Sequence, residues 1–254
     1  MTELPNIQEF LVPRRPASRY GAVEVAHLWS PLDEIGGDFL YYEQVAEQFV
    51  SLEIGDVIGH GTHAGLVMTA LHGLLFGLRQ QVVPLDRMLA SANEFLWRLQ
   101  QLQTSQSRDA TFRSLLCSMF LLRIDLKNQT LTYSNAGHPP ALYLPSGVDA
   151  DVLWLESGGL ILGALPTATY QASQLRPVSG DTILLFTDGL SESRNPSGDE
   201  LGMARLEAIL REIQPLNVRQ IVDEVNTRLA AYRGGAAATD DVAVAVVRFG
   251  NKWS

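Results

Sequence analysis

The segment DVAVAVVRF, residues 241–249, is the feature that most restricts how this chain can fold. It is rich in β-branched residues, which favours a strand, and apolar side chains occupy both of its alternating faces. A strand that is apolar on both faces belongs in the interior of a sheet that is covered on each side. The sequence therefore predicts a layered fold in which this last strand is central.

Further short segments with strand character occur along the rest of the chain. They contain many β-branched and aromatic residues and are separated by turn signals. We expect strands at AVEVAHLW (22–29), DFLYYEQ (38–44), FVSLEIGD (49–56), SLLCSMFLLRID (114–125), TLTYSNAG (130–137), ALYL (141–144), VLWLE (152–156), YQASQLRPV (170–178) and DTILLFTDG (181–189).

Helical periodicity separates these strands into groups. Leucine and alanine recur at every fourth residue from Leu66 to Leu78, with Thr62 as the expected N-cap and Pro84 as the break. Further helices are expected at 86–102, 203–213 and 218–232. Strands, two helices, strands, two helices and a last strand indicate an α+β fold, an antiparallel sheet sandwich with helices outside.

The expected domain organisation is simple. Residues 1–18 hold three of the twelve prolines and are expected to form a lead-in or linker, and residues 19–250 one domain. The N-terminus lacks the cationic start and apolar core of a signal peptide, and no apolar run approaches the length of about 20 residues that spans a bilayer. The single cysteine, Cys117, excludes an intrachain disulfide. We therefore expect a cytoplasmic protein.

Composition excludes some classes of partner. The formal net charge is −9 and the pI is near 5.0, so neither a nucleic-acid backbone nor an anionic membrane surface is expected as the main partner. Hydrophobic residues make up 46% of the chain, which is enough for a sizeable core. The composition gives no indication of the oligomeric state.

The stretch GDVIGHGTHAG, residues 55–65, has more glycine than a turn requires. Gly55, Gly59 and Gly61 surround Asp56 and His60. Glycine permits tight backbone bends and close approach of another group. We therefore expect the backbone here to bend around a ligand.

Acidic residues recur beside glycine at the ends of expected strands. Asp38 follows Gly36-Gly37, Asp56 and Asp188 end strands, and Asp240 and Asp241 open the last one. If these strand ends converge, the carboxylates raise one another's pKa unless a cation compensates them, and an oxygen-only set favours Mg²⁺ or Mn²⁺. Ordinary turn chemistry also explains each site taken alone, and spacing does not show convergence.

Five blocks, taken in order, resemble a known family. They are IGGDF (35–39), DVIGHGTHAGLVM (56–68), SNAGHPPALYL (134–144), LLFTDGLSES (184–193) and TDDVAVAVV (239–247). They are similar to the signature blocks of the SpoIIE/RsbU-type branch of the PPM (PP2C-like) metal-dependent serine/threonine protein phosphatases, from about residue 7 to residue 248. The resemblance implies an αββα sandwich of two mostly antiparallel sheets flanked by helices.

The resemblance also implies a site with two Mn²⁺ or Mg²⁺ ions. By it, Asp56 bridges both metals and the main-chain carbonyl of Val57 binds one of them. By the same resemblance, Asp38 binds the second metal, and Asp188 and Asp240 bind the first. Asp241, beside Asp240, is an alternative ligand.

The implied reaction is hydrolysis of a phosphoserine or phosphothreonine ester by a metal-activated water. Asp56 and His60 are then the catalytic candidates, with His60 as proton donor to the leaving group. The alternative for His60 is a hydrogen bond within its own turn. His138, in a proline-rich turn, is interpreted as structural.

Three positions depart from the family pattern. Tyr41 stands where an aspartate is common three residues after the GGD aspartate, which puts an extra metal or water ligand there in doubt. Ala243 replaces the usual threonine of the last block, and His63 replaces a proline or similar residue at the helix start. The four main carboxylates are retained.

The family analogy suggests a phosphorylated STAS-domain protein, an anti-anti-sigma-type regulator, as the substrate. Two other functions remain open. One is a non-catalytic phosphoprotein-binding module that keeps the fold. The other is a metal-dependent hydrolase of small phosphoesters, although the chain has no P-loop sequence.

Overall fold

The computed structural model describes residues 11–32, 35–59, 61–106, 115–147 and 150–250. The described strands form two sheets in which every pairing is antiparallel. The six-stranded sheet has the order β1-β2-β11-β10-β7-β8 and the five-stranded sheet β3-β4-β5-β6-β9. The first comprises β1 (Ala17–Tyr20), β2 (Val23–Ser30), β7 (Ala141–Leu144), β8 (Leu153–Leu155), β10 (Thr182–Phe186) and β11 (Val242–Phe249); the second comprises β3 (Asp38–Val45), β4 (Phe49–Val57), β5 (Cys117–Asp125), β6 (Thr130–Ala136) and β9 (Ala172–Leu175).

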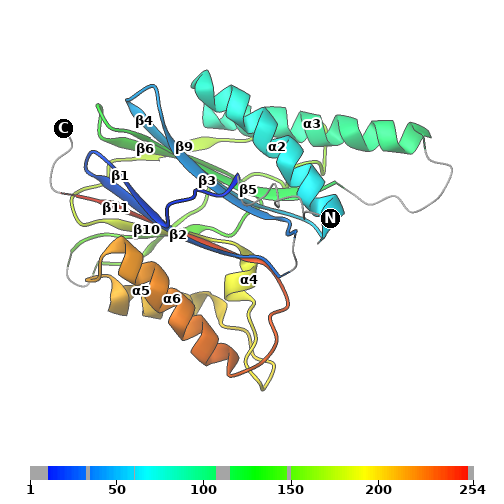
Figure 1. The fold of residues 1–254 in the computed structure, drawn as a ribbon. Coiled ribbons are helices and arrows are strands. Elements are labelled where there is room, and N and C mark those ends of the chain that lie inside the picture. Colours follow the sequence, from blue (N-terminus) through cyan, green and yellow to red (C-terminus); the bar gives the residue numbers. More distant parts are fainter. Residues whose placement is uncertain (1–10, 33–34, 60, 107–114, 148–149, 251–254) are drawn as a thin grey trace, which may run out of the picture.

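Helices cover the outer face of each sheet (Figure 1). The helices α2 (Thr62–Gln80) and α3 (Leu85–Gln106) lie over the five-stranded sheet. The helices α5 (Gly202–Ile213) and α6 (Val218–Arg233) lie over the six-stranded sheet, and the short α4 (Asp188–Ser191) follows β10. The predicted αββα sandwich is therefore confirmed, and none of the helices among the described residues has both the length and the hydropathy needed to cross a bilayer.

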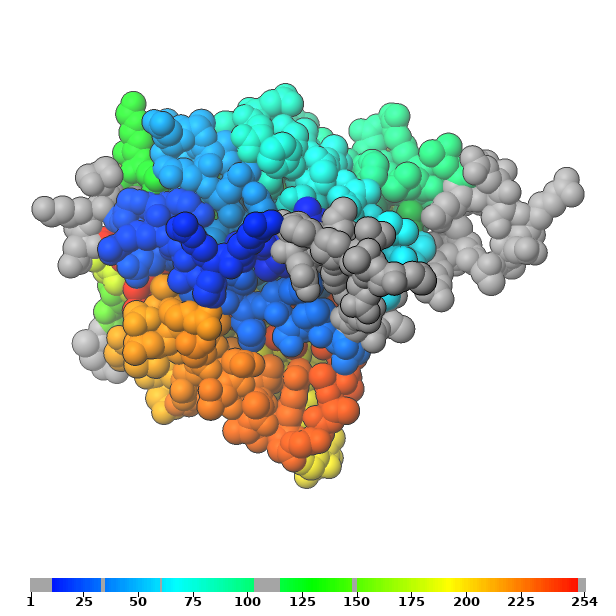
Figure 2. Space-filling view, viewed as in Figure 1, coloured from blue at the N-terminus to red at the C-terminus, as the bar shows by residue number. Residues whose placement is uncertain are grey.

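Strand alternation divides the core into three layers. Even-numbered positions of β3, β4 and β5 face the six-stranded sheet, as Leu40, Ile54 and Phe120 do. Odd-numbered positions face α2 and α3. The expectation for the last strand is also met, because β11 lies between β2 and β10 with alternate residues in the inter-sheet core and under α5 and α6. The helix layers lie on opposite sides of β1, β2 and β3 in the space-filling view (Figure 2).

Several element boundaries differ from those predicted. β1 begins at Ala17, inside the expected lead-in, because Ala17 and Ser18 pair with Ala26 and Val25 of β2. Thr62 is the first residue of α2 and not its N-cap. That position is taken by Gly61, whose φ of 75° suits glycine.

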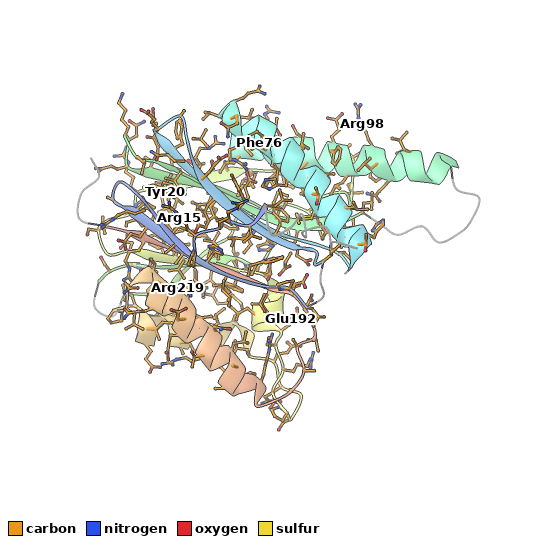
Figure 3. The ribbon with its side chains drawn as sticks, in the orientation of Figure 1. Arg15, Tyr20, Phe76, Arg98, Glu192 and Arg219 are labelled. Atoms are coloured by element: carbon orange, nitrogen blue, oxygen red, sulfur yellow. The ribbon has the colours of Figure 1, made fainter. Side chains whose placement is uncertain are left out.

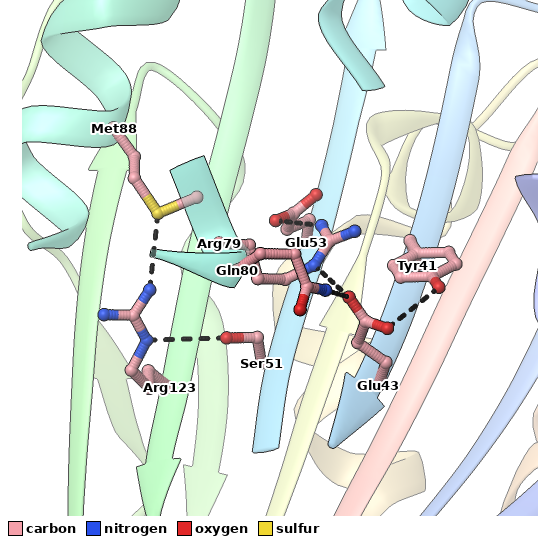
Figure 4. Close-up of polar contacts among 8 residues, drawn as sticks. All are labelled: Tyr41, Glu43, Ser51, Glu53, Arg79, Gln80, Met88 and Arg123. Atoms are coloured by element: carbon pink, nitrogen blue, oxygen red, sulfur yellow. Dashed lines mark hydrogen bonds and ion pairs between the residues drawn. The ribbon is translucent and has the colours of Figure 1, made fainter. Parts of the chain in front are cut away.

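A buried ion network attaches the end of α2 to the five-stranded sheet (Figure 4). Arg79 is completely buried, and its guanidinium donates to Glu53 of β4 at 2.5 Å and to Glu43 of β3 at 2.6 Å. Gln80 also donates to Glu43, and the Arg79 guanidinium lies 4.5 Å from the centre of the Tyr41 ring. The network pairs the charged side chains that are buried between the end of α2 and the sheet.

Candidate metal centre

The register of β3 and β4 brings two of the predicted acids together. Asp38 is the first residue of β3 and is the Cα partner of Asp56 near the end of β4. Both positions belong to the strand face that points into the gap between the sheets. Asp38 is buried and Asp56 is half-buried, so both carboxylates lie at the edge of this gap.

Thr187 connects the six-stranded sheet to this pair. Its hydroxyl donates to Asp38 at 2.6 Å and accepts from the main-chain N–H of Ala243 at 2.9 Å, while its own N–H donates to the Ala243 carbonyl at 3.0 Å. These bonds extend the pairing of β10 with β11 by one residue beyond Phe186. Asp188 is the first residue of α4, which corrects the prediction that it ends the strand. Sequence reasoning missed Thr187, although it directly precedes Asp188.

The Asp241 carboxylate is hydrogen-bonded to main-chain N–H groups of the loop before β3. Its carboxylate accepts from the N–H groups of Leu32 at 2.6 Å, Gly37 at 2.8 Å and Asp38 at 3.4 Å. Gly36 is required there, since a Cβ at that position would lie 2.2 Å from the same carboxylate. Asp240 and Asp241 precede β11 and do not belong to it. Asp241 thus holds the loop that presents Asp38.

The close backbone approach expected at residues 55–65 occurs at Gly37, which lies against that stretch. A Cβ built on Gly37 would lie 2.5 Å from the Val57 carbonyl oxygen, 3.0 Å from the Gly59 carbonyl oxygen and 3.2 Å from Asp56 Oδ1. Three oxygen atoms therefore surround one small space that only glycine leaves open. Gly59 has a φ of 102°, which also favours glycine. The Gly59 carbonyl was not among the predicted ligands.

The electrostatics show uncompensated negative charge. Burial, and then the Asp56 charge, raises the pKa of Asp38 well above its ordinary value. Burial, followed by Asp188, Asp240 and Asp241, raises the pKa of Asp56 to about 7. No lysine or arginine of the described residues forms an ion pair with Asp38, Asp56 or Asp188. A bound divalent cation would compensate this charge.

Asp38, Asp56, Asp188 and Asp240 are here called the acidic cluster, because the charges of Asp188 and Asp240 act on Asp56 and those of Asp56 and Asp240 act on Asp38. A further acid at its rim is Glu192, beside α4 in Figure 3, whose pKa is raised by burial first and then by Asp188, Glu200 and Asp240. Sequence reasoning did not include Glu192. The signal that points to it is its position in the block that contains Asp188.

The donor chemistry fits a hard divalent cation. Carboxylates and main-chain carbonyls are all oxygen ligands, which Mg²⁺ and Mn²⁺ prefer. Within the described part of the chain, no three His, Cys, Asp or Glu side chains converge on one point closely enough to hold a metal by themselves.

The remaining predicted residues lie elsewhere or outside the described residues. His60 is outside them. Tyr41 is three residues from Asp38, so it points to the other face of β3. There its ring contacts His72 and Arg79, and its hydroxyl donates to Glu43. The position where an extra ligand was in doubt therefore faces α2 and not the acidic cluster.

Comparison with known proteins identifies the family. The family model of stage II sporulation protein E, SpoIIE, matches residues 47–250, most of the chain. The chain belongs to the SpoIIE family. The predicted resemblance to the SpoIIE/RsbU-type branch of the PP2C-like phosphatases is thereby confirmed.

Individual relatives of this SpoIIE-family chain agree with the assignment. Phosphoserine phosphatase RsbU of Bacillus subtilis is 29% identical over 76% of the chain, and phosphoserine phosphatase RsbP of the same organism 28% over 67%. The chain spans 53% of RsbU and 40% of RsbP. The SiaA-PP2C domain of Pseudomonas aeruginosa has the same fold, with a TM-score of 0.77 at 22% identity, over 96% of this chain and 93% of that one.

One substitution tests the oxygen-lined space in this SpoIIE-family chain without removing an acid. We expect Gly37→Ala to weaken Mn²⁺ binding by about 10–100-fold, because the new methyl group would lie against the Val57 carbonyl. Calorimetric titration with Mn²⁺ measures the effect. Gly73→Ala on α2 is the matched control, since a Cβ there meets nothing within 4 Å. Equal affinities for the two variants would contradict the role given to the Val57 and Gly59 carbonyls.

Proposed function

We propose that the chain is a metal-dependent serine/threonine phosphoprotein phosphatase. The observation that carries this proposal is the acidic cluster. There Asp56 lies beside the Val57 and Gly59 carbonyls, and burial together with neighbouring acids raises the pKa of both Asp38 and Asp56. Membership of a family whose relatives RsbU and RsbP are named phosphoserine phosphatases supports it.

Each residue has a defined part in the proposal. Asp38, Asp56, Asp188 and Asp240 hold two Mn²⁺ or Mg²⁺ ions together with the Val57 carbonyl, and the Gly59 carbonyl adds a further oxygen. When bound, such ions activate water and neutralise charge on the phosphoryl group.

Thr187 and Asp241 position the loops that carry these ligands. Thr187 fixes Asp38 relative to β11, and Asp241 fixes the main chain before Asp38. We therefore assign both a positioning role, in place of the metal-ligand role considered for Asp241.

The protein itself supplies no thiol nucleophile. Cys117 is fully buried, and burial, then the charges of Asp56 and Asp38, raises its pKa well above the usual value. A thiolate is the reactive form of cysteine, so Cys117 is inert at neutral pH. Hydrolysis by water is consistent with this setting.

The proposed substrate is a phosphorylated protein, namely a STAS-domain regulator of the anti-anti-sigma type. The support is the naming of RsbU and RsbP as phosphoserine phosphatases, together with the net charge of −9, which is unsuited to nucleic acid. A cytoplasmic location and a dimetal Mn²⁺ or Mg²⁺ cofactor are parts of the same proposal.

Hydrolysis of a phosphoserine peptide across Mn²⁺ and Mg²⁺ titrations tests the assignment. We expect activity that depends on the metal, is absent in EDTA and falls at least about 100-fold in Asp188→Asn. Asp223→Asn is the control, because Asp223 is an exposed residue of α6 paired with Arg219. Full activity in EDTA would refute the metal mechanism. Mn²⁺ binding without hydrolysis would favour the non-catalytic binding module.

A further inference from the structure

The crossover between the two sheets carries a buried histidine that the proposed reaction does not use. β6 of the five-stranded sheet ends at Ala136, and β7 of the six-stranded sheet begins at Ala141. His138 lies in this connection and is only 5% exposed. The side chain therefore lies where the chain passes from one sheet to the other.

The backbone around His138 is held in one conformation. The Asn135 side chain accepts from the His138 N–H at 2.8 Å and donates to the His138 carbonyl at 2.9 Å. Gly137 between them has a φ of 67°, and a Cβ there would lie 3.0 Å from the main-chain nitrogen of Ile161. The imidazole is consequently fixed in position by its neighbours.

The protonation of the ring follows from its surroundings. Burial lowers the pKa of His138 to about 3, so the ring is neutral at physiological pH. Its Nδ1 lies 2.7 Å from the Ser118 hydroxyl. Its Nε2 is buried without a partner of hydrogen-bond geometry in the described residues, although the Phe186 carbonyl is near enough to favour protonation. Since a carbonyl only accepts, the proton belongs on Nε2, and Ser118 donates to Nδ1.

Both neighbours of the ring adjoin the acidic cluster. Ser118 of β5 is the Cα partner of Asp56 and faces the same inter-sheet gap. Phe186 is the last residue of β10, two positions before Asp188. The imidazole thus stands between the strand beside Asp56 in one sheet and the strand end before Asp188 in the other.

We propose that His138, together with Ser118, is a positioning residue that sets the separation of the two sheets at the acidic cluster and thereby its affinity for divalent cations. This inference rests on the proposed function. His138 touches none of the four acids, so it acts through the strands that carry them. Partners that are hydrogen-bonded to the ligands themselves typically change metal affinity by 10–100-fold, so a residue acting through the strands should lie at the lower end of that range.

A second buried histidine provides a matched control. His27 of β2 is 8% exposed, its Nδ1 lies 3.0 Å from the Tyr42 hydroxyl of β3, and burial lowers its pKa to about 4. It too links the two sheets through a hydroxyl. Tyr42 is four residues along β3 from Asp38, roughly 13 Å at the rise of a strand. Its loss removes an inter-sheet bond without adjoining the acidic cluster.

The experiment is a calorimetric Mn²⁺ titration of the full chain with the variants Ser118→Ala, His138→Gln, His138→Asn and His27→Asn. Glutamine retains a donor near Nε2, whereas asparagine retains an acceptor near Nδ1, so the pair separates the two sides of the ring. We expect Ser118→Ala and His138→Gln to weaken Mn²⁺ binding about tenfold and His138→Asn to weaken it less. Combining Ser118→Ala with His138→Gln should add nothing further, because both remove the same bond.

Two additional readouts separate positioning from general stability. Peptide hydrolysis at saturating Mn²⁺ should stay within about threefold of wild type, while the Mn²⁺ concentration for half-maximal activity shifts with the affinity. His27→Asn should lower the unfolding temperature without shifting that concentration. If His138→Gln does not fold, Ser118→Ala, which removes one hydroxyl, carries the test.

The outcomes distinguish this inference from the function on which it rests. Unchanged Mn²⁺ affinity in folded Ser118→Ala and His138→Gln would overturn it, as would an equal loss in His27→Asn. A wild-type chain that binds Mn²⁺ but hydrolyses no phosphopeptide would overturn the phosphatase assignment, and the affinity comparison would still decide the role of His138. A wild-type chain that binds no Mn²⁺ would overturn both.

Discussion

Replacing Asp56 by asparagine is expected to abolish metal-dependent hydrolysis while making the metal-free protein more stable. Asp56 would help to hold the metal ions in the proposed site, so its loss should lower kcat/KM by at least about 10³-fold, or about 4 kcal/mol in the transition state. No described protein group donates a hydrogen bond to its carboxylate, so the amide breaks no existing interaction. Phosphopeptide hydrolysis at saturating Mn²⁺ measures the loss.

The stability gain of Asp56→Asn should depend on pH. Burial, Asp188, Asp240 and Asp241 raise the pKa of Asp56 to about 7 in the folded chain, above the ordinary value of 3.8. Between these values the folded state binds the extra proton, so the Asp56 contribution to stability is complete below about pH 4 and is lost as the pH rises through 7.

Thermal or urea unfolding in EDTA shows the effect directly. The asparagine variant should exceed wild type by about 2 kcal/mol at pH 8, after allowance for the partial exposure of Asp56, and by little at pH 4.5. Asp223→Asn on the exposed face of α6 should show neither the loss of activity nor this gain. A variant that is less stable than wild type at pH 8 would contradict the repulsion argued for the acidic cluster.

The second large effect concerns stability and lies in the network around Arg79. Glu53→Ala is expected to lower the free energy of unfolding by about 3–5 kcal/mol, because it leaves a buried guanidinium without its buried partner. The Arg79 side chain is 0% exposed and that of Glu53 is 2% exposed. Burial raises the pKa of Glu53 in spite of the opposing charge of Arg79, so desolvation is the larger influence on the carboxylate.

The neighbouring acid of the network serves as the comparison. Glu43 also binds Arg79, but its side chain is 24% exposed, so Glu43→Ala should cost less than Glu53→Ala. The double variant Arg79→Met with Glu53→Leu removes both charges and should recover most of the loss. Urea unfolding measures all three. A loss below about 1 kcal/mol for Glu53→Ala would show that water or another group compensates Arg79.

The periodicity of apolar residues predicted the strands and helices that bury one or both faces in the core. β11 is apolar at every position from Val242 to Val247, and its interior place in the sheet follows from that alone. Asp38, Asp56 and Asp188 stand beside glycine near expected strand ends, but turn chemistry also explains each one alone, and the family resemblance carried their assignment as ligands. Their convergence required the pairing of strands that lie far apart in sequence, which no local pattern contains.

The residues that sequence analysis did not identify were missed for one physical reason, which is that their roles depend on contacts with distant parts of the chain. Thr187 and Ser118 matter through hydroxyl bonds to residues of other strands, and a threonine or serine in a strand has no distinctive pattern. The Gly59 carbonyl belongs to the main chain, which every residue has. Glu53 occupies the alternate face of an apolar strand, where a charge ordinarily indicates solvent, and only the position of Arg79 on α2 shows that it is buried.

The hydrogen bond that the Gly37 N–H donates to the Asp241 carboxylate joins residues 204 positions apart, and β11 lies between β2 and β10. During translation, a chain that has already emerged with Asp38, Asp56 and Asp188 still lacks the strand that joins the two halves of the six-stranded sheet. Contacts of such long range make folding slow, and until β11 arrives β2 and β10 have unpaired edges. The ribosome must therefore finish nearly all of the described chain before Asp241 can hold the loop that presents Asp38.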